Sequence, residues 1–289
     1  MTISTFIIFC LNGLTNGMLL FLISAGLTLI FGVMGILNFA HGSLYMLGAY
    51  LTFSLVTHGL NFWIALIFAP MAVAIIGAII ESIFVRRIYH QDVSFQLLLT
   101  FAFVLLINDL VRLVWGSAPL TTPTPELFAG TVQIFDRPYP AYNLLIIILA
   151  PLVGISLWLF LSKTRLGKIM RAVAQDRVMA GALGINVPQL FTRVFMLGAW
   201  LGGVAGVLVA PLRTLNPAMA DNVIIESFII TVIGGLGSLP GALVGALLLG
   251  LVNSFGILIA PRAQVAFPFI LMAITLLFRP QGLFGKIQR

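Results

Sequence analysis

Apolar stretches of about 20 residues recur along the whole chain, and they constrain its fold more than any other feature. A helix of this length and composition crosses the hydrocarbon core of a bilayer. Such stretches predict helices at residues 5–31, 35–57, 62–85, 95–115, 141–161, 190–212, 218–234, 241–259 and 265–278. The expected fold is an all-α polytopic membrane protein, a single domain over residues 1–289 with a bundle of about eight to nine transmembrane helices.

The stretch 218–234 is the weakest of these predictions. It contains Asp221 and Glu226, and its uncharged part, residues 228–233, is too short to cross a bilayer alone. Either the segment crosses as half of a broken helix, or the chain has eight full spans and one irregular element.

Composition excludes a soluble globular enzyme. Only 8% of the residues are charged, against about 25% in ordinary soluble domains, and the mean hydropathy is +1.15. A single cysteine, Cys10, excludes an intrachain disulfide framework and a thiolate-rich metal site. The net charge of +7 comes from basic residues between the apolar stretches, which favours anchoring at a membrane surface over binding to nucleic acid.

The basic residues also predict the orientation. Eleven of the 15 fall on one side of the predicted helices, and only Arg112, Arg137, Arg213 and Arg262 fall on the other. Cytoplasmic segments carry an excess of Lys and Arg, so the C-terminus is expected in the cytoplasm and the N-terminus in the periplasm. This bias requires the segment 218–234 to cross the membrane.

Two segments between the apolar stretches differ in character. Residues 116–140 contain five prolines and are expected to form an ordered external loop, since prolines at this density prevent one continuous helix. Residues 162–189 are basic and polar and are expected at the cytoplasmic surface. Within them, residues 167–182 predict one short surface helix that ends at Gly184.

A run of small residues separates two of the predicted helices near the inner face. No helix passes unbroken through this density of glycine and proline. The run is either a tight turn or a flexible element that moves when the bundle changes shape. Its members are Gly234, Gly235, Gly237, Ser238 and Gly241.

Polar side chains in apolar helices are costly and therefore informative. Asn12 and Asn16 share one helix face, and Asn38 and His41 lie at the start of the second apolar stretch. Each is explained either by a hydrogen bond between helices or by a place along a polar pathway. The sequence contains no phosphate-binding loop, and we identify no cluster of metal ligands and no grouped nucleophile and base. Transport is therefore expected rather than catalysis.

One alternative is a passive channel. The tripeptide Asn216-Pro217-Ala218 resembles the pore tripeptide of the aquaporin class. That family uses a pair of such tripeptides, and the other candidate here is Asn38-Phe39-Ala40. No arginine follows Ala218, and the predicted helices exceed six.

Longer strings carry a second resemblance. They are Gly-Ile-Leu-Asn-Phe-Ala-His-Gly at 35–42, Met-Leu-Gly-Ala-Tyr at 46–50, Gly-Gly-Leu-Gly-Ser at 234–238 and Arg-Pro-Gln-Gly-Leu-Phe-Gly at 279–285. In this order they closely resemble the inner-membrane permeases of bacterial branched-chain amino acid type ABC importers, over nearly the whole chain.

The resemblance implies ATP-driven import by alternating access in the bacterial inner membrane. It implies a second, related permease, two cytoplasmic ATPase subunits that hold ATP and magnesium, and a periplasmic solute-binding protein. This chain would supply half of the pathway and hold no cofactor. The solute would be a branched-chain amino acid, another amino acid, an amide, urea or a small carboxylate, and a pathway without an evident buried charge favours a zwitterion or a neutral solute.

The resemblance also suggests roles for particular residues. It identifies residues 162–189 as the segment that contacts the ATPase. The residues expected to couple this chain to the ATPase are Arg171, Ala172, Gln175, Asp176 and Gly184. The candidates for lining the translocation pathway are Asn12, Asn16, Asn38 and His41.

Overall fold

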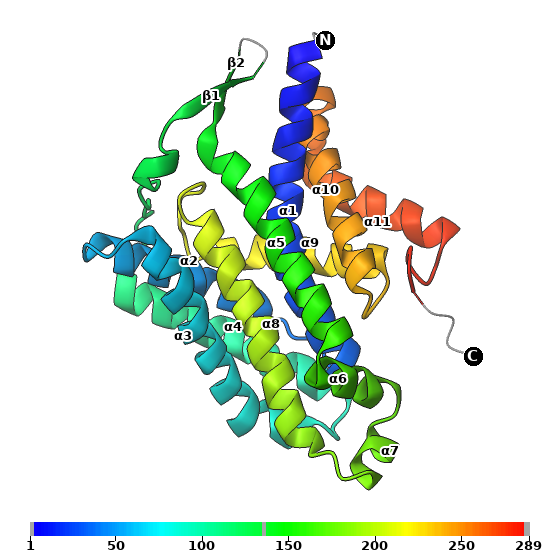
Figure 1. Cartoon of the computed structure of the whole chain (residues 1–289). Coiled ribbons are helices and arrows are strands. Elements are labelled where there is room, and N and C mark those ends of the chain that lie inside the picture. The colour runs from blue at the N-terminus through cyan, green and yellow to red at the C-terminus, as the bar shows by residue number, and fades with distance from the viewer. Residues whose placement is uncertain (1–2, 135–136, 286–289) are drawn as a thin grey trace.

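The computed structural model describes residues 3–134 and 137–285, and within them the chain forms eleven α-helices (Figure 1). The first five are α1 (Ile3–Met34), α2 (His41–Thr57), α3 (Phe62–Ile83), α4 (Val93–Trp115) and α5 (Ala141–Lys163). The others are α6 (Arg165–Gln175), α7 (Arg177–Ala182), α8 (Val187–Val209), α9 (Met219–Gly234), α10 (Leu239–Ile259) and α11 (Phe267–Phe278). Every apolar stretch of the sequence contains one of these helices, which confirms the predicted all-α polytopic fold.

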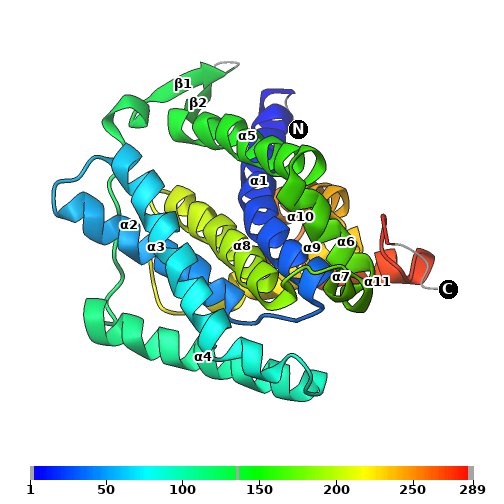
Figure 2. The same ribbon diagram turned by 60° about the horizontal axis from the view of Figure 1, so that its bottom comes forward.

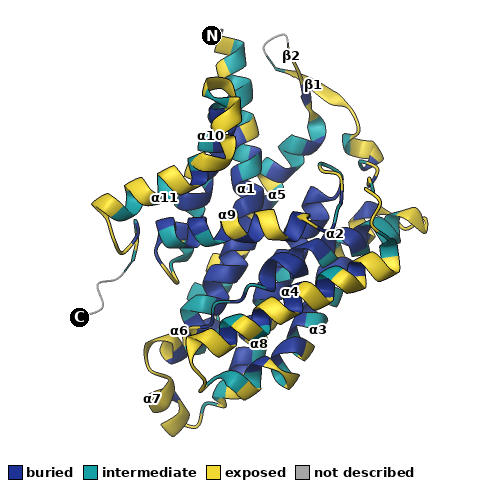
Figure 3. Cartoon of the chain, turned by 180° about the vertical axis from the view of Figure 1, so that it is seen from behind, coloured by how far each residue is buried: buried dark blue, intermediate teal, exposed yellow. Residues whose placement is uncertain are grey.

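Within the described residues, seven segments are long and apolar enough to cross a membrane: α1, α3, α4, α5, α8, α10, and Pro261–Phe278, which joins a 3-10 turn to α11. The helices α2 and α9 are shorter, with 17 and 16 residues, and lie inside the bundle. In Figure 3, α9 runs across the bundle rather than along it.

The start of α2 differs from the prediction. The sequence predicts a helix from residue 35, but residues 35–40 are not helical and α2 begins at His41. Gly35 adopts a φ of +70°, which ends α1 in the left-handed conformation that glycine tolerates best. The non-helical residues return the chain into the bundle, where His41 Nε2 lies 2.9 Å from the carbonyl oxygen of Ile23.

The centre of the bundle is formed by α1 and α8, with α3, α4 and α5 around them (Figure 2). Within an apolar 18-residue stretch of α1, 89% of the residues are buried. In the corresponding stretches of α4 and α5, only 28% are buried. Small residues allow the central helices to approach closely, because a Cβ atom at Gly26 would lie 2.6 Å from the carbonyl oxygen of Gly198. The outer helices α4 and α5 expose large apolar side chains, as expected of surfaces that face lipid.

The two ends of the bundle carry different structures. At one end, near the start of α1, residues 116–140 contain a 3-10 turn (Glu126–Phe128) and an antiparallel hairpin of β1 (Thr131–Ile134) and β2 (Arg137–Pro140) (Figure 1). We call this the hairpin end. At the opposite end lie α6 and α7, together with the turn between α9 and α10. Residues 281–285 pack on that turn, with hydrogen bonds from Leu283 N to Ile233 O and from Phe284 N to Gly234 O.

Candidate functional site

A polar cavity of about 450 Å³ opens toward the hairpin end, between α1, α9 and α10. Asn12 and Asn16, two of the predicted pathway residues, both line it. The other lining residues are Phe9, Thr15, Leu19, Asn143, Leu212, Arg213, Glu226, Asn253, Ser254, Ile257 and Gln264. We call this space the outer cleft.

Two charged residues in the outer cleft were not predicted as site residues. A guanidinium nitrogen of Arg213, Nη2, donates to Asn16 Oδ1 at 3.0 Å. Glu226, on α9, accepts a hydrogen bond from Asn253 Nδ2 at 3.1 Å. The sequence contains one signal for this site, because Glu226 interrupts an apolar stretch, but hydropathy alone explains that charge as a weakness of the predicted helix. The outer cleft therefore carries an exposed cation and a partly buried anion.

Asn38 and His41 lie apart from the outer cleft. Both are completely buried where the non-helical segment meets the start of α2. The His41 ring contacts the middle of α1 through the carbonyl oxygen of Ile23 and lies close to Gly26. Among the described residues, the Asn38 side chain has no hydrogen-bond partner. The four predicted pathway residues thus divide into an outer pair in the cleft and an inner pair in the core.

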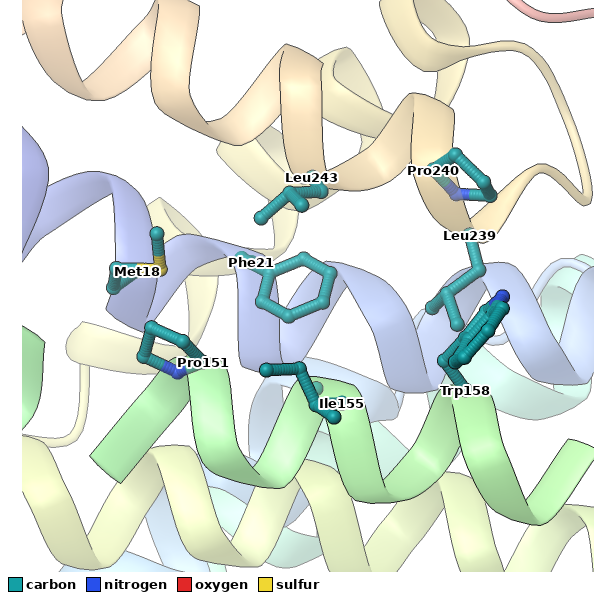
Figure 4. Close-up of a pocket in the computed structure, with 9 residues that line it drawn as sticks. Met18, Phe21, Pro151, Ile155, Trp158, Leu239, Pro240 and Leu243 are labelled. Carbon is teal, nitrogen blue, oxygen red and sulfur yellow. The ribbon is translucent and has the colours of Figure 1, made fainter. Parts of the chain in front are cut away.

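An apolar groove of about 350 Å³ lies between α1, α5 and the start of α10 (Figure 4). Phe21, Ile155 and Leu243 face one another across it, and Trp158 lies beside Leu239 at one end. Aliphatic and aromatic side chains line this groove. It therefore suits lipid chains or apolar side chains, and the outer cleft is the better candidate for a polar solute.

The segment predicted as one surface helix forms two. Asp176 adopts an extended conformation between α6 and α7, and its Oδ1 accepts the backbone N–H of Met179 at 2.8 Å. The single predicted helix over 167–182 is therefore wrong, because an aspartate at this position caps a new helix. Gly184 follows α7 with a φ of +85°, which confirms the predicted end of this segment.

The residues predicted to contact the ATPase are all exposed. Met170 and Val173 bury one face of α6. The exposed residues are Arg171, Ala172 and Gln175 on α6, Asp176 between α6 and α7, and Gly184 after α7. The neighbouring Arg177 is also exposed, but its Nη2 donates to the carbonyl oxygen of Met34 at 3.4 Å, and its guanidinium carbon lies 5.8 Å from the centre of the Phe191 ring. Arg177 therefore links α7 to the end of α1 and to α8.

The small-residue run forms a packed turn between α9 and α10. Gly235 and Gly237 adopt φ values of +95° and +83°, and Ser238 Oγ accepts the backbone N–H of Gly241 at 3.1 Å to cap α10. Gly234 packs against Gly241, and Gly237 against Gly32 at the end of α1. The sequence left open a tight turn or a flexible element, and the structure shows a tight turn. Movement of this turn during transport stays a prediction.

We expect Gly235→Ala to lower the free energy of unfolding by about 2–4 kcal/mol. A Cβ atom there would lie 2.5 Å from the backbone nitrogen of Gly285, and the backbone conformation disfavours any side chain. Thermal unfolding in detergent measures the effect. Gly59→Ala, with a φ of +86° and open space, isolates the conformational strain, and Gly181→Ala, in open space within α7, is the neutral control. Equal stability of the Gly235 and Gly59 variants would contradict the packing role.

Long apolar helices around a polar cleft, with two exposed helices at the opposite end, define a polytopic membrane permease. The family model described as the branched-chain amino acid transport system permease component matches residues 9–276. The chain belongs to this family of permeases.

The relatives are permeases of the same transport class, and the matches cover nearly the whole length of two of them. BraD from Pseudomonas aeruginosa, a high-affinity branched-chain amino acid transport system permease protein, is 34% identical, and the match covers 95% of this chain and 94% of BraD. LivH from Escherichia coli K12, described in the same words, is 29% identical, and the match covers 95% of this chain and 94% of LivH. LivM from the same organism, also described in these words, is 25% identical, and the match covers 93% of this chain and 68% of LivM. The chain is thus the permease subunit of an importer, and none of these relatives is a channel.

One solved structure has a similar fold. PsaBC from Streptococcus pneumoniae in complex with Fab superposes with a TM-score of 0.51 at 14% identity, covering 94% of this chain and 92% of that chain. At this identity the likeness concerns the fold alone.

Proposed function

We propose that this chain forms half of the translocation pathway of an ATP-driven importer, and that separate ATPase chains bind ATP and magnesium and supply the work. The single observation that carries this proposal is the surface of α7 at the end opposite the outer cleft. Val178 and Leu183 are 79% and 76% exposed there, next to the exposed Met179. Apolar side chains grouped on a segment outside the membrane mark a contact with another protein.

The attachment of α7 supports a role in coupling. Arg177 joins it to the carbonyl end of α1 and to Phe191 on α8. These are the two central helices, and α1 also lines the outer cleft. A partner that moves α7 would therefore move the helices that border the cleft, as alternating access requires.

The charge distribution supports the orientation. The end that carries α6 and α7 has Lys163, Arg165, Lys168, Arg171 and Arg177, so we place it in the cytoplasm together with the C-terminus. The N-terminus and the loop over residues 116–140 then lie in the periplasm. There, the hairpin end would receive a solute-binding protein.

The outer cleft supports a paired assembly. Asn12, which lines the cleft, is exposed, so this side of the cleft is free to be covered by another chain. A second, related permease would complete the pathway. The similarity of this chain to both LivH and LivM of one organism supports two related subunits, and the names of these relatives support branched-chain or similar amino acids as solutes.

Reconstitution tests the proposed function. The complete complex in vesicles, supplied with L-leucine and its binding protein, should accumulate leucine only when ATP and magnesium are present on the ATPase side. The control omits nucleotide. Equal uptake without nucleotide, or by this chain alone, would contradict the importer and favour a passive channel.

A further inference from the structure

We propose that Arg213 and Glu226 form a recognition site for the charged end of a zwitterionic solute in the outer cleft. Arg213 would bind the carboxylate and Glu226 the ammonium group. This inference rests on the proposed function, which brings such a solute through the cleft, and it assigns two residues to recognise it.

Arg213 has free capacity to bind an anion. Its hydrogen bond to Asn16 uses one of the five N–H donors of a guanidinium. Within the described residues, no carboxylate lies within 4.0 Å of it. Guanidinium groups bind carboxylates through two parallel hydrogen bonds, so Arg213 suits the α-carboxylate of an amino acid.

Glu226 offers the complementary group. It is only partly exposed, and among the described residues only the side chain of Asn253 donates a hydrogen bond to it. Asn253 is itself 7% exposed, and within the described part of the chain its Oδ1 atom has no hydrogen-bond partner. The Glu226 carboxylate therefore presents acceptors to the N–H donors of an ammonium group, whereas Asn253 Oδ1 is itself buried.

The separation of the two charges favours a zwitterion over a simple ion. Arg213 and Glu226 line the same cavity, but in the described residues they form no ion pair with each other. Glu226 is partly buried and Arg213 is exposed, so an unpaired charge is costly chiefly at Glu226, and a ligand can compensate both charges. A solute with adjacent positive and negative groups does so, whereas an anion or a cation compensates one and faces the repulsion of the other.

The rest of the outer cleft suits an aliphatic side chain. Phe9, Leu19, Leu212 and Ile257 supply apolar surface beside the polar groups. The cavity volume of about 450 Å³ lies within the range of about 300–1,000 Å³ typical of small-molecule sites. The chemistry of the cleft therefore matches an amino acid with an apolar side chain.

Charge-removing variants in the reconstituted complex test the site. Arg213→Gln and Glu226→Gln should each lower the rate of L-leucine uptake by about 10- to 100-fold, the effect of losing a charged hydrogen bond, while hydrolysis of ATP by the complex is retained. Arg112→Gln, at the same end on α4, and Asp221→Asn, exposed on α9, are matched controls outside the cleft. Uptake by both cleft variants within twofold of the unaltered complex would overturn the proposal.

Thiol protection in the complete complex gives a second measurement that keeps both charges. Gln264 lines the cleft and is exposed, so Gln264→Cys in a Cys10→Ser chain should react with a methanethiosulfonate reagent. Millimolar L-leucine should slow this reaction at least threefold, whereas leucine amide, which lacks the carboxylate, and 4-methylpentanoate, which lacks the ammonium group, should not. If the three compounds slow the thiol reaction equally, or if none of them slows it, the proposed site is overturned. This outcome is decisive even if the Gln variants fail to assemble. If leucine protects but no nucleotide-driven uptake occurs, the site stands and the proposed function fails.

Discussion

Replacing Val178 and Leu183 together by aspartate is expected to lower ATP-dependent uptake by more than about 100-fold while the chain still inserts in the membrane. Each side chain is highly exposed on or just beyond α7, and each would be buried if an ATPase subunit covers this surface. Loss of one buried apolar anchor costs about 2 kcal/mol or more of binding free energy, so two losses weaken the contact by about 1,000-fold. Co-purification of the ATPase subunits and uptake in vesicles measure the effect.

The matched control for this variant lies at the hairpin end. Leu127 and Val132 are also exposed apolar residues, at 77% and 43%, and Leu127→Asp with Val132→Asp makes the same chemical change on the opposite face. This control should retain the ATPase subunits. Exchanging the charges of Arg171 and Asp176 is a poorer test, because Asp176 caps α7 and its loss would unfold the surface being tested. Full ATPase co-purification with the α7 variant would show that the contact lies elsewhere.

The second large effect is expected for Gly26→Leu, which should destabilise the bundle by more than about 3 kcal/mol. A Cβ atom at Gly26 would lie 2.6 Å from the carbonyl oxygen of Gly198 and 2.8 Å from His41 Cε1. The first neighbour is backbone of a central helix, and the second is a completely buried ring bound to Ile23. Moving the Gly198 backbone would separate α8 from α1, and moving the His41 ring would break the contact of α2 with α1. Thermal unfolding in detergent, followed by size-exclusion chromatography, measures the loss.

Two further variants serve as comparisons for Gly26→Leu. Gly181→Leu places the same side chain in open space and should leave the unfolding temperature unchanged. Gly26→Ala adds only the Cβ atom and should fall between the other two. An unfolding temperature of Gly26→Leu within about 2 °C of the unaltered chain would contradict the close packing of these helices.

Local composition was sufficient to predict where the helices lie. Crossing a bilayer requires a continuous apolar stretch, so the spans from α3 to α5 and the span of α10 follow from hydropathy with small changes at their ends. Gly184 was predicted for a similar reason, because a helix commonly ends at a glycine in the left-handed conformation. The proline-rich loop likewise could not be a helix.

Tertiary structure decided what hydropathy cannot detect. Hydropathy predicts that residues 35–40 are helical. In the structure they are not helical, and they lead the chain back into the bundle, where His41 contacts α1. The break at Asp176 is a local feature that hydropathy also misses, because the aspartate side chain caps the next helix. The outer cleft depends on contacts far apart in the sequence, from Arg213 to Asn16 and from Asn253 to Glu226. Periodicity and composition describe each segment alone, but a binding site is formed by side chains from several segments, and only helix packing determines which of them meet.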